Sequence, residues 1–418
     1  MEITKHLIIG AGPAALAAAQ AIRETDISAE ITLVTKENSI PYSPAMLPYL
    51  ISKELDENDF FAKGKDLLDN LNIKLLFGKE VVAVWPEKNE VEYADGVREA
   101  YDKLLIAAGA SPQITLKDQL PEEQIFTFRT FQDFERLNKI LGTQQEIAIF
   151  GAGLVAVEAA EKLCLAGHKV TVIARSSLLR KYFDPQNVAA LTQAFNKCGA
   201  KIITKNTLVA AKKMDNKLEL TLENGDTLLV DRLIAATGVA ANLIKHDSLA
   251  LAEGGLKVGK YMETELPNIY AAGDVAAAPC FFGGQNAPCP ILPEAVLQGK
   301  IAGANMAGET VEYEGWVPCN YLRCFDEHLF SIGVTSTAEG QPYQVVEKRD
   351  GGSSLKLVFD EDCLIGAEGL NMKYTHPGVF LYLIKEQIPV KKYKDLLMDK
   401  PKETACWLMS QHRKNQAI

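Results

Sequence analysis

The feature that most constrains this chain is a glycine-rich turn between an apolar strand and a helix, and it occurs twice. The first copy, HLIIGAGPAALAAAQAI, places Gly10, Gly12 and Ala15 in the spacing G-x-G-x-x-A. The first glycine allows a tight turn, the second lets the backbone approach a pyrophosphate, and the small third residue lets helix pack on strand. Free N–H groups and the dipole at the start of the helix favour an anion. The pattern predicts a Rossmann-like dinucleotide-binding unit.

The sequence around this turn extends the same pattern. A second strand, EITLV, follows at the expected distance, and Glu37 lies just beyond it, where a carboxylate can accept hydrogen bonds from a ribose. The motif then recurs in EIAIFGAGLVAVEAAEKL, with Gly151, Gly153 and Ala156, and HKVTVI supplies its second strand. Two such units predict two dinucleotides held by separate domains.

The bulk composition sets the class of protein. A length of 418 residues suggests two or three domains, and 47% hydrophobic with 23% charged residues is normal for a soluble globular protein. The net charge of −10 argues against nucleic acid as the main partner. No apolar run approaches the roughly 20 residues that span a bilayer. The start, MEITKHLIIGAG, leaves no room for a signal peptide, so we expect a cytoplasmic protein without membrane contact.

The 8 cysteines are scattered, and no CxxC pair occurs among them. Two looser pairs, Cys280 with Cys289 and Cys319 with Cys324, could belong to an iron–sulfur or zinc site. Neither spacing matches the usual patterns of such sites, and free cysteine is among the most buried residue types. We therefore expect buried thiols and no metal.

Three later segments connect the two halves of the chain. YDKLLIAAGASP (101–112) is an apolar strand that ends in small residues, and DRLIAATGVAAN (231–242) is its analogue after the second unit. LPNIYAAGDVA (266–276) places Asp274 at a strand end after Gly273. An acid on such a tip can bind the polyol of a flavin, and glycine permits close approach. The alternative role of Asp274 is a helix N-cap.

The ordered set of motifs resembles the flavoproteins with two dinucleotide-binding domains, the pyridine nucleotide–disulfide oxidoreductase family, over roughly residues 1–310. The fold class expected is α/β, with two Rossmann-like domains and a C-terminal α+β interface domain. The resemblance implies FAD on residues 1–112 and 239–310 and NAD(P) on residues 113–238. Residues 311–418 would form the interface domain and tail.

The resemblance also implies roles for individual residues. Those implied for FAD are Gly10, Gly12, Pro13 and Ala14 at the pyrophosphate, Glu37 at the adenosine ribose, and Asp274 at the ribityl chain. Those implied for the nicotinamide nucleotide are Gly151, Gly153, Leu154, Val155 and Arg175. The remaining cofactor-binding candidates are Tyr42, Ala45, Met46, Val82, Ala108, Gly109, Gly238 and Gly273. Glu158 matches the family's glutamate beside the nicotinamide and is the one candidate for a catalytic role; a solvent-facing helix glutamate is the alternative.

The second unit departs from NAD-preferring relatives after its second strand. Many of those carry an acid there to hold the ribose hydroxyls, whereas this chain has Ala174 and then Arg175. Removing the acid and adding a guanidinium favours a 2′-phosphate and hence NADP. Arg175 can equally stack on adenine, so the choice between NAD and NADP stays open.

The run SIPYSPAMLPYLI (39–51) carries the sharpest functional clue. It resembles the loop of coenzyme A–disulfide reductases and NADH oxidases or peroxidases, in which a redox cysteine precedes a similar Leu-Pro-Tyr. Ala45 stands in that place, and no cysteine lies between Met1 and Glu161. Disulfide exchange needs an attacking sulfur, so the family's usual dithiol route is excluded, and a thiolate supplied by Cys280 or Cys289 after folding would be an unusual alternative. Electrons are expected to leave from the flavin itself, past Ala45 and Met46. His376, in a His-Pro pair like that of disulfide reductases, receives no role without the dithiol.

From about residue 311, runs such as SSLKLVFDEDCLIGAEGL read as antiparallel strands. The tail from Val390 is net basic and carries the apolar run CWLM. In relatives this region forms a dimer interface or closes the flavin site. The tail could dock on an acidic iron–sulfur protein, or a solvated helix could pack Trp407 on its own domain.

The thiol-free loop and the length resemble the FAD subunits of phenylglyoxylate dehydrogenase and of tungsten aldehyde oxidoreductase. The expected activity is a diaphorase-type, FAD-dependent NAD(P)H oxidoreductase whose partner is an iron–sulfur protein or subunit. Alternatives are a stand-alone rubredoxin or ferredoxin reductase, resembling the nitrite reductase branch as well, and a non-catalytic flavin-binding regulatory or scaffold subunit. Intact motifs in both units favour the enzyme.

Overall fold

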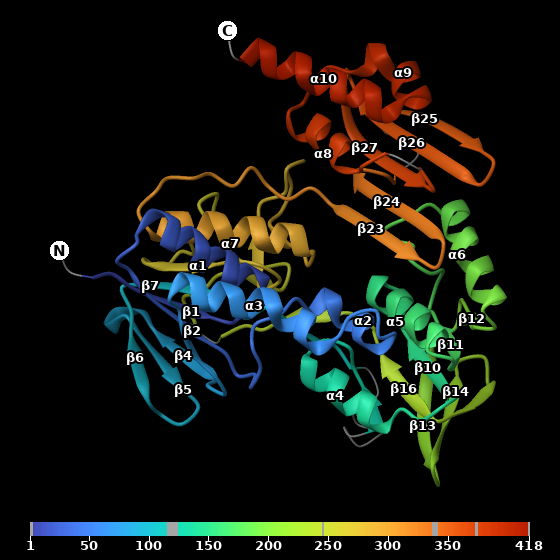
Figure 1. Ribbon diagram of the computed structural model, residues 1–418, viewed down its shortest axis with the longest axis horizontal. Coiled ribbons are helices and arrows are strands. Elements are labelled where there is room, and N and C mark those ends of the chain that lie inside the picture. Colours follow the sequence, from blue (N-terminus) through green and yellow to red (C-terminus); the bar gives the residue numbers. More distant parts are fainter. Residues whose placement is uncertain (1–2, 115–123, 245, 337–341, 373–374, 417–418) are drawn as a thin grey trace. The chain divides into compact units, whose positions relative to one another are not determined.

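The computed structural model describes residues 3–114, 124–244, 246–336, 342–372 and 375–416 (Figure 1). Helices and strands alternate along the chain, which confirms the expected α/β fold class. The chain divides into two compact units, and each is described by itself. The first unit comprises Met1–Gln113, Thr127–Ile140 and Gly238–Trp316. The second comprises Ile114–Phe126, Leu141–Thr237 and Val317–Ile418. These units are defined by contacts and not by ligands, so the expected FAD, NAD(P) and C-terminal domain borders stay a prediction.

A five-stranded parallel sheet forms the centre of the first unit, in the order β20-β7-β1-β2-β3. Its strands are β1 (Lys5–Ile9), β2 (Glu30–Val34), β3 (Lys74–Leu76), β7 (Lys103–Ile106) and β20 (Ile269–Ala271). The central strands are apolar and almost fully buried, as expected of a parallel sheet covered on both faces. The first glycine motif lies at the end of β1, which is the central strand.

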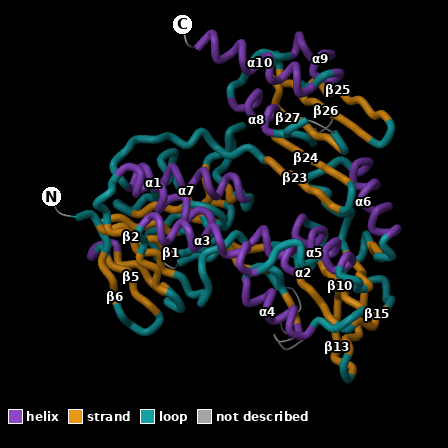
Figure 2. Tube along the Cα trace, viewed as in Figure 1, coloured by secondary structure: helices purple, strands orange, loops and turns teal. Residues whose placement is uncertain are grey.

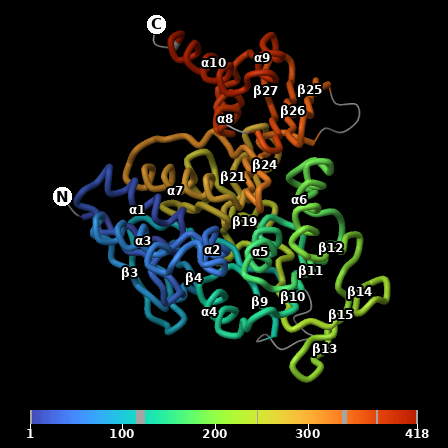
Figure 3. Tube along the Cα trace, turned by 45° about the vertical axis from the view of Figure 1, so that its right-hand side comes forward, coloured from blue at the N-terminus to red at the C-terminus, as the bar shows by residue number. Residues whose placement is uncertain are grey.

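Helix α1 (Pro13–Thr25) packs along α7 (Leu292–Met306), and the two lie side by side in Figures 1 and 3. Small residues bring the backbones together. A Cβ atom on Gly299 would lie 2.1 Å from the Ala14 carbonyl oxygen, and one on Gly303 would lie 2.3 Å from that of Ala18. This contact fixes the start of α1, where the predicted pyrophosphate site lies.

The rest of the first unit surrounds this core. Its other helices are η1 (Pro44–Met46), α2 (Leu47–Ile51), α3 (Glu57–Leu71), η2 (Pro86–Lys88) and α4 (Phe131–Ile140). An antiparallel three-stranded sheet consists of β4 (Val81–Trp85), β5 (Glu90–Tyr93) and β6 (Arg98–Ala100). A two-stranded ribbon pairs β8 (Ala110–Pro112) with β17 (Val239–Ala241). A four-stranded sheet contains β18 (Leu251–Ala252), β19 (Gly255–Lys257), β21 (Ala276–Ala278) and β22 (Ala287–Pro288).

The second unit repeats the parallel arrangement, in the order β12-β11-β10-β16-β9. The strands are β9 (Ile125–Phe126), β10 (Glu146–Phe150), β11 (Lys169–Ile173), β12 (Lys201–Ile203) and β16 (Arg232–Ala235). Helix α5 (Leu154–Leu165) follows β10, and α6 (Pro185–Lys197) follows β11. An antiparallel sheet is built from β13 (Leu208–Met214), β14 (Lys217–Leu222) and β15 (Thr227–Val230). The second glycine motif again follows the central strand.

The C-terminal segment of the second unit contains a five-stranded antiparallel sheet, in the order β23-β24-β27-β26-β25, with helices following it (Figure 2). The strands are β23 (Cys319–Cys324), β24 (Glu327–Gly333), β25 (Gln344–Asp350), β26 (Ser353–Asp360) and β27 (Cys363–Leu370). The helices are α8 (Gly378–Lys385), η4 (Lys391–Tyr393), α9 (Lys394–Asp399) and α10 (Pro401–Gln416). Trp407 packs edge-on against Tyr393 at 5.2 Å between ring centroids and stays 44% exposed. Among the described residues, no helix combines the length and apolar character needed to cross a membrane.

Candidate functional site

The first glycine of each motif is required by the backbone. Gly10 has φ +112°, and a Cβ atom there would lie 2.2 Å from the Ala107 carbonyl oxygen. Gly151 has φ +150°, and its Cβ would lie 2.1 Å from the Ala236 carbonyl oxygen. Both distances are far below a van der Waals contact, so only glycine lets the turn lie against the neighbouring strand.

The second glycine of each motif faces open space. Gly12 is the N-cap of α1 and Gly153 is the N-cap of α5, and neither makes a side-chain capping bond. A Cβ atom on either glycine would meet nothing within 4 Å. Neither helix carries an acid in its first turn. Each helix therefore directs the N–H groups of its first turn and its positive dipole end toward open space, as an anion site requires.

The predicted neighbours of these glycines lie where an anion site needs them. Pro13 occupies the first turn of α1, and Ala14 is buried under Gly273, with 3.1 Å between its Cβ and a Cβ placed on that glycine. Leu154 and Val155 begin α5, and Val155 is 47% exposed. The structure therefore brings Gly12, Pro13, Ala14 and Gly273 together in the first unit.

Glu37 lies just beyond β2 and is held by a buried tyrosine. Tyr42 Oη donates to Glu37 Oε2 at 2.6 Å and accepts from the Phe131 N–H at 2.8 Å. Burial, reinforced by the Glu37 carboxylate, raises the pKa of Tyr42 far above its ordinary range, so the hydroxyl stays a donor. Tyr42 packs among the rings of Phe60, Phe61 and Phe131. Sequence reasoning named Tyr42 and Glu37 separately and did not find the bond between them.

Asp274 lies in a turn that leads into strand β21, so the helix N-cap alternative is wrong. Its partner is Arg129, which the sequence did not indicate. Arg129 Nη2 donates to Asp274 Oδ2 at 2.7 Å, and its Nε donates to the Ala110 carbonyl at 3.0 Å. Both side chains are largely buried, at 27% and 13% exposed. Gly273, with φ +80°, donates its N–H to Gln298 Oε1 at 2.9 Å, which fixes the turn.

Ala108 and Gly109 lie at the end of β7 and are tied to the strand that returns from the second unit. Asn242 Nδ2 donates to the Ala108 carbonyl at 2.8 Å, and the Asn242 N–H donates to the Gly109 carbonyl at 2.9 Å. Gly109 and Gly238 have φ +65° and +120°. Asn242, which directly follows β17, is a second residue that sequence reasoning missed.

The loop with no thiol forms the short helix η1, where Ala45 is exposed and Met46 is 38% exposed. Val82 lies on β4 and is 45% exposed. The structure thus leaves all three side chains accessible. No described contact joins Val82 to the glycine loops, so its place near a nucleotide stays a prediction.

Glu158 lies on α5, five residues after Gly153, in a partly buried place. Burial, followed by the Glu161 carboxylate, raises the pKa of Glu158 from its ordinary value of 4.5 to about 7, and Lys162 opposes this rise. Glu161 and Lys162 form a buried ion pair at 3.3 Å, and Glu161 also accepts from the Phe325 N–H. Glu158 is half-buried, so its place beside the nicotinamide stays a prediction, with the solvent-facing helix glutamate as the alternative.

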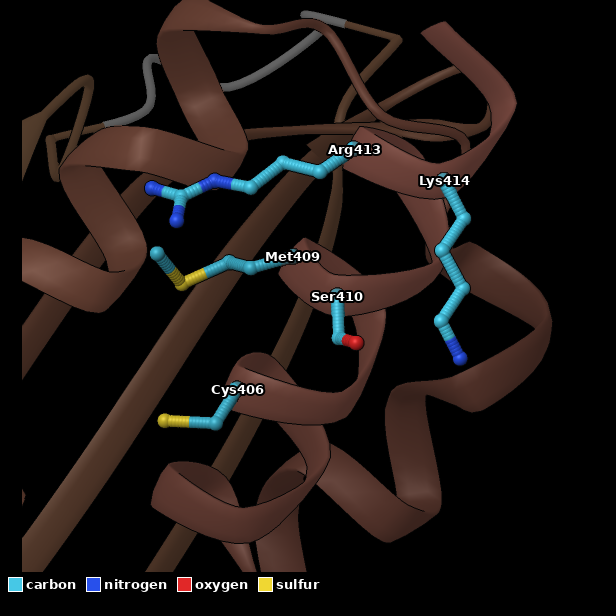
Figure 4. A pocket seen from close by; sticks show the side chains of 5 residues that line it. All are labelled: Cys406, Met409, Ser410, Arg413 and Lys414. Atoms are coloured by element: carbon cyan, nitrogen blue, oxygen red, sulfur yellow. The ribbon is translucent and has the colours of Figure 1, made fainter. Parts of the chain in front are cut away.

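The cysteines and His376 form no recognisable site. All eight cysteines are free thiols. Among the described residues, no group of three or more His, Cys, Asp or Glu side chains is arranged to hold a metal ion. His376 Nδ1 accepts from the Gly378 N–H at 3.1 Å, a local turn contact. A hollow on α10 contains none of the predicted site residues, so no site is built on it (Figure 4). Its lining residues are Cys406, Met409, Ser410, Arg413 and Lys414.

Two glycine turns in one chain, each between a central parallel strand and a helix, are typical of a protein with two dinucleotide sites. The sequence profile of the pyridine nucleotide-disulphide oxidoreductase family matches residues 4–308, and the chain belongs to this family. Members of the family are flavin oxidoreductases that use FAD and NAD(P)H, and this confirms the resemblance seen in the motifs. The chain is therefore an oxidoreductase of this flavoprotein type.

Three comparisons describe its relatives. The chain is 34% identical over 418 residues, 98% of each chain, to the NADH-dependent phenylglyoxylate dehydrogenase subunit epsilon of Aromatoleum evansii. It is 31% identical over 376 residues to the 3-phenylpropionate/cinnamic acid dioxygenase ferredoxin–NAD(+) reductase component of Photorhabdus laumondii, covering 89% of this chain and 94% of that one. An engineered water-forming NADPH oxidase, a mutant of the Lactobacillus brevis enzyme bound to NADPH, shares the fold with a TM-score of 0.83 and 23% identity, covering 92% and 91%.

The substitutions that define the engineered oxidase follow a spacing found in this chain. The first substitution changes a glycine to alanine. Starting 18 positions later, three consecutive residues become alanine, arginine and serine. The last substitution changes a proline to arginine, seven positions after the first residue of that Ala-Arg-Ser run. This chain carries Ala156 in its glycine motif, and 18 positions later Ala174, Arg175 and Ser176. The basic Lys181 follows seven positions after Ala174.

Proposed function

We propose that this FAD-dependent NAD(P)H oxidoreductase is of the diaphorase type. It passes electrons between a nicotinamide nucleotide and a one-electron iron–sulfur partner, as the flavin subunit of a larger oxidoreductase complex. The observation that carries the proposal is the combination of two intact pyrophosphate cradles with a loop that has Ala45 where a redox thiol would stand. Without that thiol the family's usual dithiol route is closed, and electrons would leave from the flavin itself.

The first unit would hold FAD. The N–H groups at the start of α1, beside Gly12 and Pro13, would bind the pyrophosphate, and the free side of Glu37 would accept from a ribose. Asp274, fixed by Arg129, would hold the ribityl chain. When bound, FAD supplies exchange between two-electron and one-electron carriers. The assignment of residues 1–112 and 239–310 to FAD is part of the proposal.

The second unit would hold the nicotinamide nucleotide, within residues 113–238. Gly153, Leu154 and Val155 present the start of α5 to its pyrophosphate. Glu158, whose pKa is about 7, would lie beside the nicotinamide and hold or release a proton near neutral pH. Exposed Ala45 and Met46 would leave a short apolar border toward an external carrier.

The names of two relatives support the proposal of an electron-transfer partner. One relative is a subunit of a phenylglyoxylate dehydrogenase and another is a ferredoxin–NAD(+) reductase component. Both names contain NADH or NAD(+), whereas the engineered oxidase that shares the Ala-Arg-Ser run is bound to NADPH. Both nucleotides are therefore candidate donors. Residues 311–418 would serve as the interface domain, toward a second copy or toward another subunit.

Anaerobic mixing of the purified chain with NADH or NADPH tests the enzyme. We expect the visible absorbance of the oxidised flavin to bleach with at least one nucleotide, because a hydride carrier reduces the flavin. Viologen dyes should then turn over, and disulfides should not. Dithionite bleaching is the control that the flavin is present and reducible. A flavin that dithionite reduces but neither nucleotide reduces would contradict the proposal.

A stand-alone reductase of rubredoxin or ferredoxin is the second candidate, and the 94% coverage of the ferredoxin–NAD(+) reductase component favours it. Purification from the native source separates the two candidates. Copurifying iron–sulfur subunits in fixed stoichiometry would support the complex. A chain that purifies alone and reduces added ferredoxin would support the free reductase.

A further inference from the structure

The segment that follows β11 is fixed against the second glycine loop. The Leu179 N–H, at φ +50°, donates to the Ala152 carbonyl at 2.8 Å, and Leu179 itself is fully buried. At the other end, the Ala174 N–H donates to the Ile203 carbonyl at 2.8 Å. Arg175, Ser176 and Ser177 therefore lie on backbone that is anchored beside the predicted pyrophosphate site.

This part of the chain is unusually basic for a protein with a net charge of −10. Residues 162–183 contain no Asp or Glu and carry five Lys or Arg residues. Three of those five, Arg175, Arg180 and Lys181, follow β11 and are exposed. Within the described part of the chain, none of these three forms an ion pair. Their charges are thus available to an anionic ligand.

The side chains at the strand end favour a phosphate over a ribose diol. An acid there would accept from the two ribose hydroxyls and repel a phosphate, but Ala174 is apolar and fully buried. Arg175 offers planar donors that match phosphate oxygens in pairs. The Ser176 hydroxyl has only a 3.4 Å bond to the Ser177 carbonyl, and the Lys205 N–H lies 3.4 Å from the Ser176 carbonyl. Arg175 and the Ser176 hydroxyl thus stand next to each other on this anchored backbone, and exposed Lys181 follows five positions after Ser176.

We propose that the second unit selects the 2′-phosphorylated nucleotide, NADP(H), and that Arg175, with Ser176 and Lys181, is the specificity-determining group. The inference rests on the proposed function, because it names the nucleotide that the second cradle takes. Its physical basis is the exchange of an acid for a guanidinium beside the adenosine ribose, in a strip of chain with no carboxylate.

The test compares two ligands that differ only by the 2′-phosphate, adenosine 2′,5′-bisphosphate and 5′-AMP. Isothermal titration of the full FAD-containing chain should show the bisphosphate binding at least about tenfold more tightly, because a charge-assisted bond contributes about 1.5–3 kcal/mol and 1.4 kcal/mol is tenfold. The preference should narrow as salt is raised, since the contact is exposed. Equal affinities at low salt would overturn the inference.

Arg175→Gln removes the charge and keeps much of the side-chain length. We expect it to weaken the bisphosphate about 10- to 100-fold and to leave 5′-AMP unchanged. Arg175→Lys should restore part of the difference. If Arg175→Gln weakens both ligands equally, the arginine stacks on adenine and the inference is wrong. Lys169→Gln is the matched control, because Lys169 begins β11, the strand that leads to Arg175, and its side chain is 75% exposed and pairs with Glu146. This variant should bind both adenosine ligands as tightly as the wild type does.

The binding assay and the flavin assay separate the inference from the proposed function. A preference for the bisphosphate, with no flavin reduction by either nucleotide, would support the inference and contradict the proposed function. Flavin reduction by NADH and NADPH at equal kcat/KM, with equal binding of the two adenosine ligands, would support the proposed function and overturn the inference. A value of kcat/KM at least about tenfold higher for NADPH would support both.

Discussion

The two glycine loops have the same backbone and different surroundings. Helix α1 after the first loop is built of small apolar residues and is clamped by α7 through Gly299 and Gly303. Helix α5 after the second loop carries Glu158, Glu161 and Lys162. The first two turns of α1 carry no charged residue, which would suit a ligand that stays bound. If the proposed function holds, α5 would place ionisable groups beside its ligand, which would suit one that binds, reacts and leaves.

The ends of the strands that follow the two glycine motifs, β2 and β11, also differ in charge. After β2, Glu37 is held by Tyr42 and can accept from a ribose. After β11, Ala174 and Arg175 offer no acceptor and one cation. Under the proposed function, one fold would serve two ligands, because the turn would bind the pyrophosphate and the strand end would select the sugar.

The largest effect is expected from filling the turn itself. Gly10→Ala and Gly151→Ala place a Cβ about 2 Å from a carbonyl oxygen, at φ values that alanine rarely adopts. We expect each to lower the free energy of unfolding by about 3–5 kcal/mol, measured by urea denaturation of the purified variants. Equal losses of unfolding free energy in the two variants would show that both turns require glycine for the same reason, a Cβ that would clash with a carbonyl oxygen of the neighbouring strand.

Gly167→Ala is the control for this experiment. Gly167 also has positive φ, at +89°, but its Cβ would meet nothing within 4 Å. Its cost should stay near about 1 kcal/mol. A loss in Gly10→Ala or Gly151→Ala no larger than in this control would show that the turns relax and that the first glycine is not required.

The second glycines should separate the two ligands without unfolding the chain. Gly12→Ala and Gly153→Ala add a methyl group to open space at ordinary φ, so we expect little change in stability. Gly12→Ala should weaken FAD about 100-fold, and Gly153→Ala should weaken the nicotinamide nucleotide by a similar factor while FAD stays bound. Flavin fluorescence during dialysis and nucleotide titration measure the two losses. Loss of FAD from Gly153→Ala would show that the units are assigned wrongly.

The Arg129–Asp274 pair tests how far the first loop depends on a remote residue. Arg129→Met leaves the largely buried Asp274 carboxylate without its partner, so we expect a loss of about 1–3 kcal/mol in unfolding free energy and weaker FAD. The double variant with Asp274→Asn should recover part of the stability, though not the FAD affinity. Arg98→Met, at a more exposed pair with Glu92, should cost at most about 1 kcal/mol. If Arg129→Met and Arg98→Met lose equal amounts of unfolding free energy, Arg129 has no special role in fixing Asp274.

Both cradles were predictable from sequence because their determinants are local. A strand, a glycine turn and a helix lie within about 20 residues, and the period of apolar residues reports burial directly. The thiol-free loop was visible for the same reason. Each of these features depends on neighbours in the chain and not on the folded contacts.

The partners of the site residues were not predictable because they are distant in the chain. Arg129 and Asp274 are 145 positions apart, and Tyr42 and Phe131 are 89 positions apart. Asp274 after a glycine and before small residues looks like a helix start, and only the pairing of β21 with its neighbours shows otherwise. Sequence patterns report burial but not which buried groups meet.

Glu158 should give the second loop a pH dependence that the first lacks. The folded chain keeps the proton of Glu158 up to about pH 7, whereas the unfolded chain releases it near 4.5. The folded state therefore binds more protons in this window, and the free energy of unfolding falls as pH rises from 4.5 to 7. Glu158→Gln should remove about 1–2 kcal/mol of this fall, and exposed Glu223→Gln should not. Parallel pH profiles for wild type and Glu158→Gln would contradict the raised pKa.

The smallest effect is expected at Ala45. Its side chain is exposed on η1, so Ala45→Ser adds one hydroxyl without burying it and should change stability by less than about 0.5 kcal/mol. Dye reduction by the FAD-bound variant should also stay within about twofold of wild type, because no atom at this position takes part in electron transfer. A large loss of dye reduction in Ala45→Ser, with FAD retained, would mean that this loop orders the flavin or its acceptor. The loop around Ala45 would then be as intolerant of substitution as the two glycine turns are expected to be.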